Sequence, residues 1–356
     1  MRNVLATGLF ISAVAFALVG GNPATSAADR SHDDSPRSAA AQSHDGLQVF
    51  TLPAAQTERK AAGQPKFVAV LSGGAGDVDD AMQELCKNAA GGEVVVLRAS
   101  GTDAYNPYFH ELCPDSPVTT LLITSAEGAA EPAAVMHVRR AGAIFIAGGD
   151  QSNYVKFWPG PLLREINADV ARGVPIGGIS AGLAVLGQFV FSARHDTITS
   201  PEAFANPFDA KLTLDRNFIS IPILRGIITD SHFSERERMG RTVAFLARIV
   251  VDGWAKRARA IGIDQATAVL VDANGRAIVV GKGSAYFLEL AHQPERCIPG
   301  QPLTVTGIKG YRIQGGSLAA PSAGFNIKRW SGHGGAAFTL SVTNGVMSRT
   351  EQQSGE

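Results

Sequence analysis

Short continuous apolar runs alternate with amphipathic segments along most of the chain. Such runs are typical of strands that are buried on both faces of a parallel sheet, and the segments between them have helical periodicity. The sequence therefore predicts an α/β fold, with a mostly parallel central sheet flanked by helices. We expect strands at 67–71, 93–97, 119–124, 143–146, 175–179, 226–228 and 268–271, and helices at 79–89, 160–172 and 238–252.

Beyond residue 280 the chain becomes rich in glycine and proline, and its pattern indicates strands at 303–313 and 337–342. Two isolated β segments rarely stand alone in water. We therefore expect an α/β domain over residues 65–290 and a β-rich C-terminal extension over 291–356 that packs on it.

The N-terminus has the features of a secretory signal. Arg2 precedes a mostly apolar stretch from Val4 to Val19, and small residues around Ala27 offer a cleavage site. The stretch is short for a bilayer span, so we expect removal of residues 1–27 and a secreted or periplasmic protein without a membrane anchor; an uncleaved anchor is the alternative. Residues 28–64 are polar and alanine-rich, which predicts a disordered tether, with a short docked strand near 47–52.

Charge and cysteine counts limit the possible partners, metal sites and disulfides. Lys and Arg together number 32, as do Asp and Glu, and no basic stripe favours nucleic acid. No metal-ligand spacing occurs, so no metal or cofactor is expected. In an exported chain, Cys86, Cys113 and Cys297 permit one disulfide in any of three pairings, of which Cys86–Cys113 closes the shortest loop.

The pentapeptide Gly-Ile-Ser-Ala-Gly at 178–182 lies between a predicted strand and a helix-like stretch. A G-x-S-x-G in this context is typical of a nucleophile elbow, where the serine occupies a strained turn that needs small neighbours. The helix that follows would direct its free N–H groups at developing negative charge. Ser180 is therefore a candidate nucleophile of a hydrolase; a glycine-rich turn without chemistry is the alternative.

Gly-Gly-Asp-Gln at 148–151 follows another predicted strand. The N–H of Gly149 is a candidate for one arm of an oxyanion hole, with the N–H of Ala181 as the other. Gln151 would then project into the pocket as a polar contact for the substrate. By itself this motif also fits a tight turn.

Asp-Ser-His-Phe at 230–233 follows a third predicted strand, and three arginines come soon after it. His232 is the natural general base for Ser180. The arginines fit either a solvated helix face or the bidentate binding of a substrate carboxylate. Because the carboxyl ends of parallel strands form sites in α/β sheets, we expect the motifs to meet there.

Together these motifs resemble those of the cyanophycinases, in the dipeptidase E-like serine peptidase family. The resemblance also includes Gly-Ile-Asp at 262–264, keeps order and spacing, and covers about residues 67–330. It implies a fold like that of class I glutamine amidotransferases, with serine replacing cysteine, and an exopeptidase that is often dimeric. The implied substrate is cyanophycin, a poly-aspartate with arginine on each β-carboxyl, which is cut to β-aspartyl-arginine dipeptides. By motif it implies Ser180 as nucleophile, His232 as base, and Gln151, Asp230, Arg236, Arg238 and Arg241 as residues that line the pocket or hold its shape.

One departure from this pattern concerns the triad. The family has a glutamate after Gly-Ile-Asp, as the third member, and this chain has Gln265. An amide can orient the histidine but cannot stabilise the imidazolium by charge, and the comparable change in a serine protease costs about 10⁴ in kcat. We therefore expect a slow enzyme, a substitute carboxylate from Asp264 or Asp196, or an inactive relative that binds peptides. A second departure, Ser231 in place of the usual glutamine, weakens the inference to cyanophycin itself.

A third interpretation is an esterase of the α/β-hydrolase type, which shares the G-x-S-x-G. In that fold the acid precedes the histidine in the chain, and Asp209 or Asp215 could formally supply it. The Gly-Gly-Asp-Gln motif and the arginines after His232 favour the peptidase.

Overall fold

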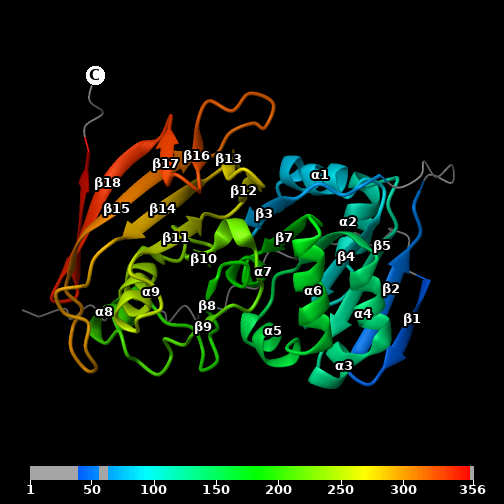
Figure 1. Ribbon diagram of the computed structural model, residues 1–356, viewed down its shortest axis with the longest axis horizontal. Coiled ribbons are helices and arrows are strands. Elements are labelled where there is room, and N and C mark those ends of the chain that lie inside the picture. Colours follow the sequence, from blue (N-terminus) through cyan, green and yellow to red (C-terminus); the bar gives the residue numbers. More distant parts are fainter. Residues whose placement is uncertain (1–38, 56–62, 353–356) are drawn as a thin grey trace, which may run out of the picture.

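The computed structural model describes residues 39–55 and 63–352, which form two large β-sheets and the helices that cover them (Figure 1). The predicted signal peptide, residues 1–27, lies outside the described residues. Within the described ranges, no helix combines the length and the apolar character needed to span a bilayer.

The first sheet has eleven strands with a parallel centre, which confirms the predicted fold class. The central strands are wholly or almost wholly buried, as continuous apolar runs require. In spatial order they are β5 (Val118–Ile123), β4 (Glu93–Arg98), β6 (Ala141–Ile146), β7 (Ile176–Ile179) and β3 (Val68–Ser72). Antiparallel strands extend the edges: β2 (Leu47–Leu52) and β1 (Ala39–His44) beyond β5, and β12 (Thr267–Asp272), β13 (Arg276–Gly281), β16 (Gly324–Asn326) and β17 (Ser331–His333) beyond β3.

Helices cover both faces of this sheet, as Figure 1 shows. On one face Met82, Leu85 and Phe109 share a core with Val96 and Phe145. Met82 and Leu85 belong to α1 (Asp79–Asn88), and Phe109 belongs to α2 (Tyr105–Leu112). The other face packs against α3 (Ala126–Ala130), α4 (Pro132–Arg139), α5 (Gln151–Phe157) and α6 (Pro161–Ala171).

The second sheet has eight strands, and it was not separated from the first in the sequence analysis. Its order is β19 (Val346–Glu351), β18 (Ala336–Thr343), β15 (Val305–Gln314), β14 (Ser284–Leu290), β11 (Ala258–Ile263), β10 (Ile227–Asp230), β8 (Phe189–Phe191) and β9 (Leu214–Arg216). Its helices are α8 (Ser200–Ala205) and α9 (Met239–Val251), and the short elements α7 (Ala181–Ala184) and η1 (Pro222–Leu224) complete the fold. The C-terminal segment thus adds strands to both sheets.

The two sheets share one hydrophobic core. Ile261, Phe287 and Ile313 of the second sheet belong to the same cluster as Val269 and Val279 of the first. This packing brings the carboxyl end of β10, in the second sheet, to the carboxyl ends of β3 and β7 in the first. The strand ends that carry the candidate motifs therefore meet between two sheets.

Within the predicted tether over residues 28–64, the described residues 39–55 are not disordered but contain two strands, and the docked strand expected at 47–52 is present as β2. β1 and β2 form an antiparallel hairpin, and β2 pairs with β5 along its whole length. The reason is the apolar content of β2, where Leu47, Val49 and Leu52 are buried. Only the docking of a short strand at 47–52 was foreseen.

Cys86, on α1, and Cys113, just after α2, form a disulfide with Cα atoms 5.3 Å apart. It joins the two helices on the same face of the first sheet and closes the shortest of the three possible loops. Cys297 is free and buried.

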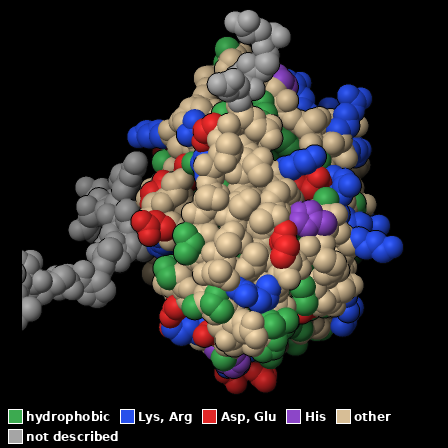
Figure 2. All heavy atoms as spheres, turned by 90° about the vertical axis from the view of Figure 1, so that its left-hand side faces the viewer, with side chains coloured by type: hydrophobic (Ala, Val, Ile, Leu, Met, Phe, Trp, Pro, Cys, Tyr) green, Lys and Arg blue, Asp and Glu red, His purple; other side chains and the backbone are tan. Residues whose placement is uncertain are grey.

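At the far end of the second sheet, acidic and basic side chains are interspersed with isolated hydrophobic ones (Figure 2).

Candidate active site

Ser180 follows β7 in a backbone conformation that few residues other than glycine adopt, with φ 54° and ψ −115°. The glycines on either side are required by close packing. A Cβ on Gly182 would lie 2.0 Å from the oxygen of Ile146, and one on Gly178 would lie 2.5 Å from the oxygen of Gly182. The strained turn with small neighbours that the motif predicts is therefore present.

His232 lies just beyond β10, also with a positive φ of 45°. Its backbone N–H donates to the oxygen of Gly73 at 2.9 Å, and its Nε2 lies 2.8 Å from the hydroxyl oxygen of Ser180. A Cβ on Gly74 would come within 2.6 Å of the imidazole ring. The glycine turn after β3 therefore makes room for the Ser–His pair.

Gln265 contacts the other nitrogen of the same ring, with its Nε2 3.0 Å from Nδ1 of His232. An amide has a donor end and an acceptor end, and turning it over exchanges them at this position. With the amide oxygen toward Nδ1–H, the Nε2 of His232 is free to accept the Ser180 proton. With the amide nitrogen there, Nε2 itself carries the proton, and the pair cannot begin the reaction.

The aspartates considered from the sequence do not replace the missing carboxylate in the described part of the chain. Asp264 is buried, and its two oxygens accept the N–H groups of Ser234 and Ser284, each at 2.9 Å. The other three also bond away from His232: Asp196 accepts from Thr197 N–H, Asp209 from Lys211 N–H, and Asp215 pairs with Arg194.

The surroundings of His232 disfavour its charged form. Burial lowers the pKa of His232 to about 4, and the cations of Arg236 and Arg238 act in the same direction, while Asp230 opposes them. At neutral pH the ring is therefore uncharged, as a general base must be. It is also a weak base, because no carboxylate hydrogen-bonds to its Nδ1 within the described residues.

The N–H groups of Gly149 and Ala181 meet no acceptor among the described residues. The Tyr154 hydroxyl lies 3.0 Å from the carbonyl oxygens of both Ala147 and Gly148. Because a trans peptide is planar, the N–H of Gly149 points away from Tyr154. A Cβ on Gly148 would lie 3.5 Å from that of Ser180, so this loop borders the serine. The helix α7 has only four residues, so any stabilisation here comes from individual N–H groups and not from a long helix dipole.

Asp230 is a buried structural anchor whose carboxylate is held by side chains of α9. Arg241 binds it through two nitrogens, at 2.8 and 2.5 Å, and the Thr242 hydroxyl donates to it at 3.0 Å. Burial opposes its charge, but Arg241 and Arg238 hold the pKa of Asp230 below its ordinary value.

The three arginines therefore differ in role, although they lie close together in the sequence. Arg241 is buried in the anchor, and Arg238 donates to the Ser231 carbonyl at 2.9 Å and reaches Asp230 at 3.4 Å. Arg236 is exposed, and its side chain has no partner in the described ranges. Gln151 donates to the Phe191 carbonyl at 3.2 Å, which ties the start of α5 to the end of β8.

Replacing Asp230 by Ala should lower the free energy of unfolding by about 3–5 kcal/mol, because the Arg241 guanidinium would be left buried without its partner. Urea denaturation of the full chain measures this. The matched control is Asp215→Ala, which removes the partly exposed Asp215–Arg194 pair and should cost less than about 1 kcal/mol. Equal losses for the two variants would contradict the anchor.

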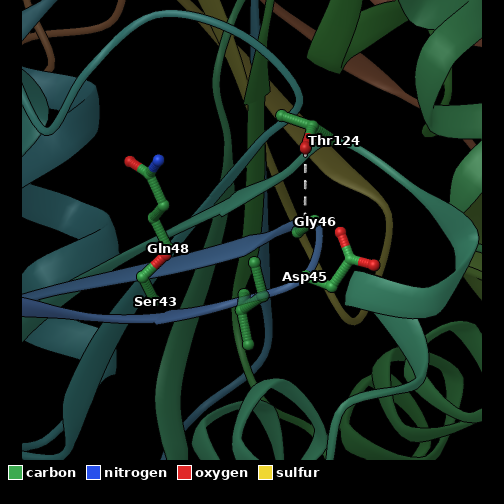
Figure 3. A pocket seen from close by; sticks show the side chains of 6 residues that line it. Ser43, Asp45, Gly46, Gln48 and Thr124 are labelled. Atoms are coloured by element: carbon green, nitrogen blue, oxygen red, sulfur yellow. Dashed lines mark hydrogen bonds between the residues drawn. The ribbon is translucent and has the colours of Figure 1, made fainter.

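A pocket of about 430 Å³ lies elsewhere, at the β1–β2 hairpin (Figure 3). It is lined by Asp45, Gln48 and Thr124 among others, and the Thr124 hydroxyl is directed at the Gly46 carbonyl. None of the candidate residues lines it. No group of three or more metal-ligating side chains is found in the described ranges.

Sequence reasoning missed three contributors to this site: Gly74 against the imidazole, Tyr154 against the 147–149 loop, and Glu235, which accepts the Gln265 backbone N–H at 3.0 Å. For Gly74 a local signal exists, because glycines at 73, 74 and 76 directly after a buried strand allow a close approach of the backbone. The other two act through contacts between distant segments, for which the sequence carries no local signal.

Known proteins give an independent view of this arrangement. No family model matches the chain. Cyanophycinases from Synechococcus elongatus and Thermosynechococcus vestitus are each 27% identical to it over 249 residues, which cover 67% of this chain and 72% of theirs. A cyanophycinase from a Nostoc species is 30% identical over 173 residues, 47% of this chain and 52% of that protein.

A solved structure of a peptidase from an acI-B1 Actinobacterium is similar with a TM-score of 0.48 and 17% identity, and the match covers 72% of this chain and 97% of that one. The sequence relatives extend over two thirds of the chain. The chain is therefore similar in sequence to cyanophycinases over two thirds of its length.

Proposed function

We propose that the protein is a serine exopeptidase that hydrolyses cyanophycin, or a related peptide of β-linked aspartate and arginine, to β-aspartyl-arginine dipeptides. The observation that carries this proposal is the 2.8 Å contact between Ser180 and His232, with the serine on a strained elbow. Relatives named cyanophycinase supply the substrate class.

In the proposed mechanism, His232 Nε2 takes the hydroxyl proton as Ser180 Oγ attacks the scissile carbonyl carbon. The N–H groups of Gly149 and Ala181 would bind the oxyanion that forms. His232 then gives its proton to the leaving amine, and the carbon–nitrogen bond breaks. A water, deprotonated by His232, attacks the acyl ester and releases the second product and free Ser180.

Arg236 is the best placed of the three arginines to bind the substrate. It is exposed, close enough to His232 to lower its pKa, and without a partner in the described part of the chain. A guanidinium there suits a substrate that is rich in carboxylates. Arg238, Arg241 and Asp230 would hold the neighbouring backbone in shape.

Substrate class is tested by offering three compounds to the purified full chain: cyanophycin, a peptide of the same composition with α-linkages, and a p-nitrophenyl ester. The proposal expects β-aspartyl-arginine from cyanophycin and no cleavage of the α-linked peptide. Hydrolysis of the ester alone would favour the esterase interpretation.

A second candidate is a peptide-binding protein that has lost its chemistry. It is favoured by the neutral Gln265 and by the low pKa of His232, both of which disfavour the imidazolium. Such a protein would bind β-aspartyl-arginine oligomers equally well as wild type and as Ser180→Ala, and would release no dipeptide from either.

We also propose that the protein acts outside the cytoplasm, in a periplasm or outside the cell. The Cys86–Cys113 disulfide supports this location, because such bonds persist in oxidising compartments. Detection of the protein in the exported fraction, with an N-terminus near residue 28, is the measurement that checks it.

Tyr154→Phe should lower kcat by about 10–100-fold and leave KM within about twofold. The variant keeps the ring stacked on Trp158 but removes the hydroxyl that orients the 147–149 loop. Steady-state kinetics on cyanophycin measure both constants. Tyr108→Phe, which removes a hydroxyl bonded to Asp79, is the matched control and should leave both constants unchanged; the same loss in both variants would overturn this role.

A further inference from the structure

Two neighbouring loops carry His232 and Gln265, and a reciprocal pair of hydrogen bonds joins them. The N–H of Ser234, on the first loop, donates to the Asp264 carboxylate at 2.9 Å. The N–H of Gln265, on the second, donates to the Glu235 carboxylate at 3.0 Å. Each loop therefore offers one carboxylate to the backbone of the other.

The two carboxylates are not equivalent. Asp264 is buried, and its second oxygen is occupied by the Ser284 N–H. Glu235 is exposed and has its second oxygen free of partners in the described ranges. It lies on the turn that begins at His232, whose carbonyl accepts the N–H of Arg236 at 3.1 Å. Glu235 is thus the carboxylate that contacts the residue at the triad's third position.

The charges around His232 disfavour its protonated form, which a nearby carboxylate would stabilise. Arg236, Arg238 and Arg241 all lower its pKa. Asp230 opposes them, but it is already bound to Arg241 and Arg238. Among the described residues, the hydrogen-bond partner of Nδ1 is the neutral amide of Gln265 alone. The Glu235 carboxylate, which accepts the backbone N–H of Gln265, would act on the imidazolium through space, with a strength that depends on salt.

We propose that Glu235 is a positioning residue that holds Gln265 against His232 and supplies, from one residue further out, the negative charge that Gln265 lacks. This inference rests on the proposed function for its meaning. Its test uses a reaction of Ser180 that does not depend on the identity of the peptide substrate.

The test measures the rate at which a fluorophosphonate probe labels Ser180 in the full chain, with Ser180→Ala as the blank. Glu235→Gln keeps an oxygen for the Gln265 N–H but removes the charge, and should slow labelling at pH 7 and low salt by about 10-fold. Glu237→Gln is the matched control, because Glu237 is an exposed glutamate of the same turn whose side chain has no partner in the described residues. It should label at the wild-type rate.

Two further readouts separate charge from a merely structural effect. The ratio of wild-type to Glu235→Gln rates should shrink toward one as NaCl rises from about 0.01 to 1 M, because the Debye length falls from about 30 to 3 Å. In the Gln265→Glu background a carboxylate already faces Nδ1, so adding Glu235→Gln should cost less than about twofold.

The inference is overturned if Glu235→Gln labels within twofold of Glu237→Gln at low salt, or if the deficit is the same at every salt concentration. If the probe does not react with Ser180, the ring shifts of ¹⁵N-labelled His232 decide the question. The His232 pKa should then fall by about one unit in Glu235→Gln, which corresponds to the tenfold change in rate, and not in Glu237→Gln. Failure to cleave cyanophycin while these differences persist would defeat the proposed substrate and leave the role of Glu235 standing.

Discussion

Gln265→Glu should raise kcat for cyanophycin hydrolysis by about 10³–10⁴-fold. The new carboxylate would face Nδ1 of His232 across a contact that now measures 3.0 Å. It has no donor end, so it would fix the tautomer whose Nε2 accepts the Ser180 proton. Its charge would also stabilise the imidazolium that burial and the arginines now disfavour.

The same substitution should move the acid limb of the pH–rate profile upward. The reaction needs neutral His232, so the rate falls as pH drops through the pKa of that residue, which is about 4 in the wild type. A neighbouring carboxylate favours the protonated ring and raises the pKa, so the limb should shift toward pH 6–7. Gln188→Glu, which places the same change beside Asn217, is the control. A folded Gln265→Glu with the wild-type rate and limb would contradict the account.

Ser180→Ala should remove hydrolysis, and the size of the loss should depend on residue 265. Triad members act as a unit: in subtilisin, losing the serine costs about 2 × 10⁶ in kcat and losing the acid alone about 3 × 10⁴. A chain that already lacks the acid therefore has less to lose. We expect about 10²-fold or more from the wild type, and about 10⁶-fold from Gln265→Glu.

Both losses are measured as dipeptide release, with near-ultraviolet circular dichroism to verify folding. The elbow backbone of Ser180 has φ 54°, which alanine adopts no more readily than serine, so the substitution does not relieve the strain of the turn. Additive losses, the same in both backgrounds, would show that Ser180, His232 and Gln265 do not act as one unit.

The parallel centre of the first sheet was predictable because its strands are apolar on both faces. The second sheet was not predictable, because β8 and β9 have three residues each and because Arg259 and Gly262 break the apolar run of β11. Periodicity also cannot tell which strands pair. It placed β10 among the parallel strands without showing that β8 and β11 are its neighbours.

The members of the site were predictable where a motif has a local cause. The elbow itself requires small residues around Ser180, and all of them lie within the five consecutive residues 178–182. The division of work among Arg236, Arg238 and Arg241 was not predictable from spacing, because it depends on Asp230 being buried beside α9. The contact of Glu235 with Gln265 depends on the packing of two loops that are 30 residues apart.

The most direct test of the central claim is the release of β-aspartyl-arginine from cyanophycin by the purified wild-type protein, followed by mass spectrometry beside Ser180→Ala. The account predicts slow release of the dipeptide by the wild type and a rate at least about 100-fold lower in Ser180→Ala. Equal release by both proteins, or none from the wild type and from Gln265→Glu alike, would contradict a serine peptidase built on Ser180, His232 and Gln265.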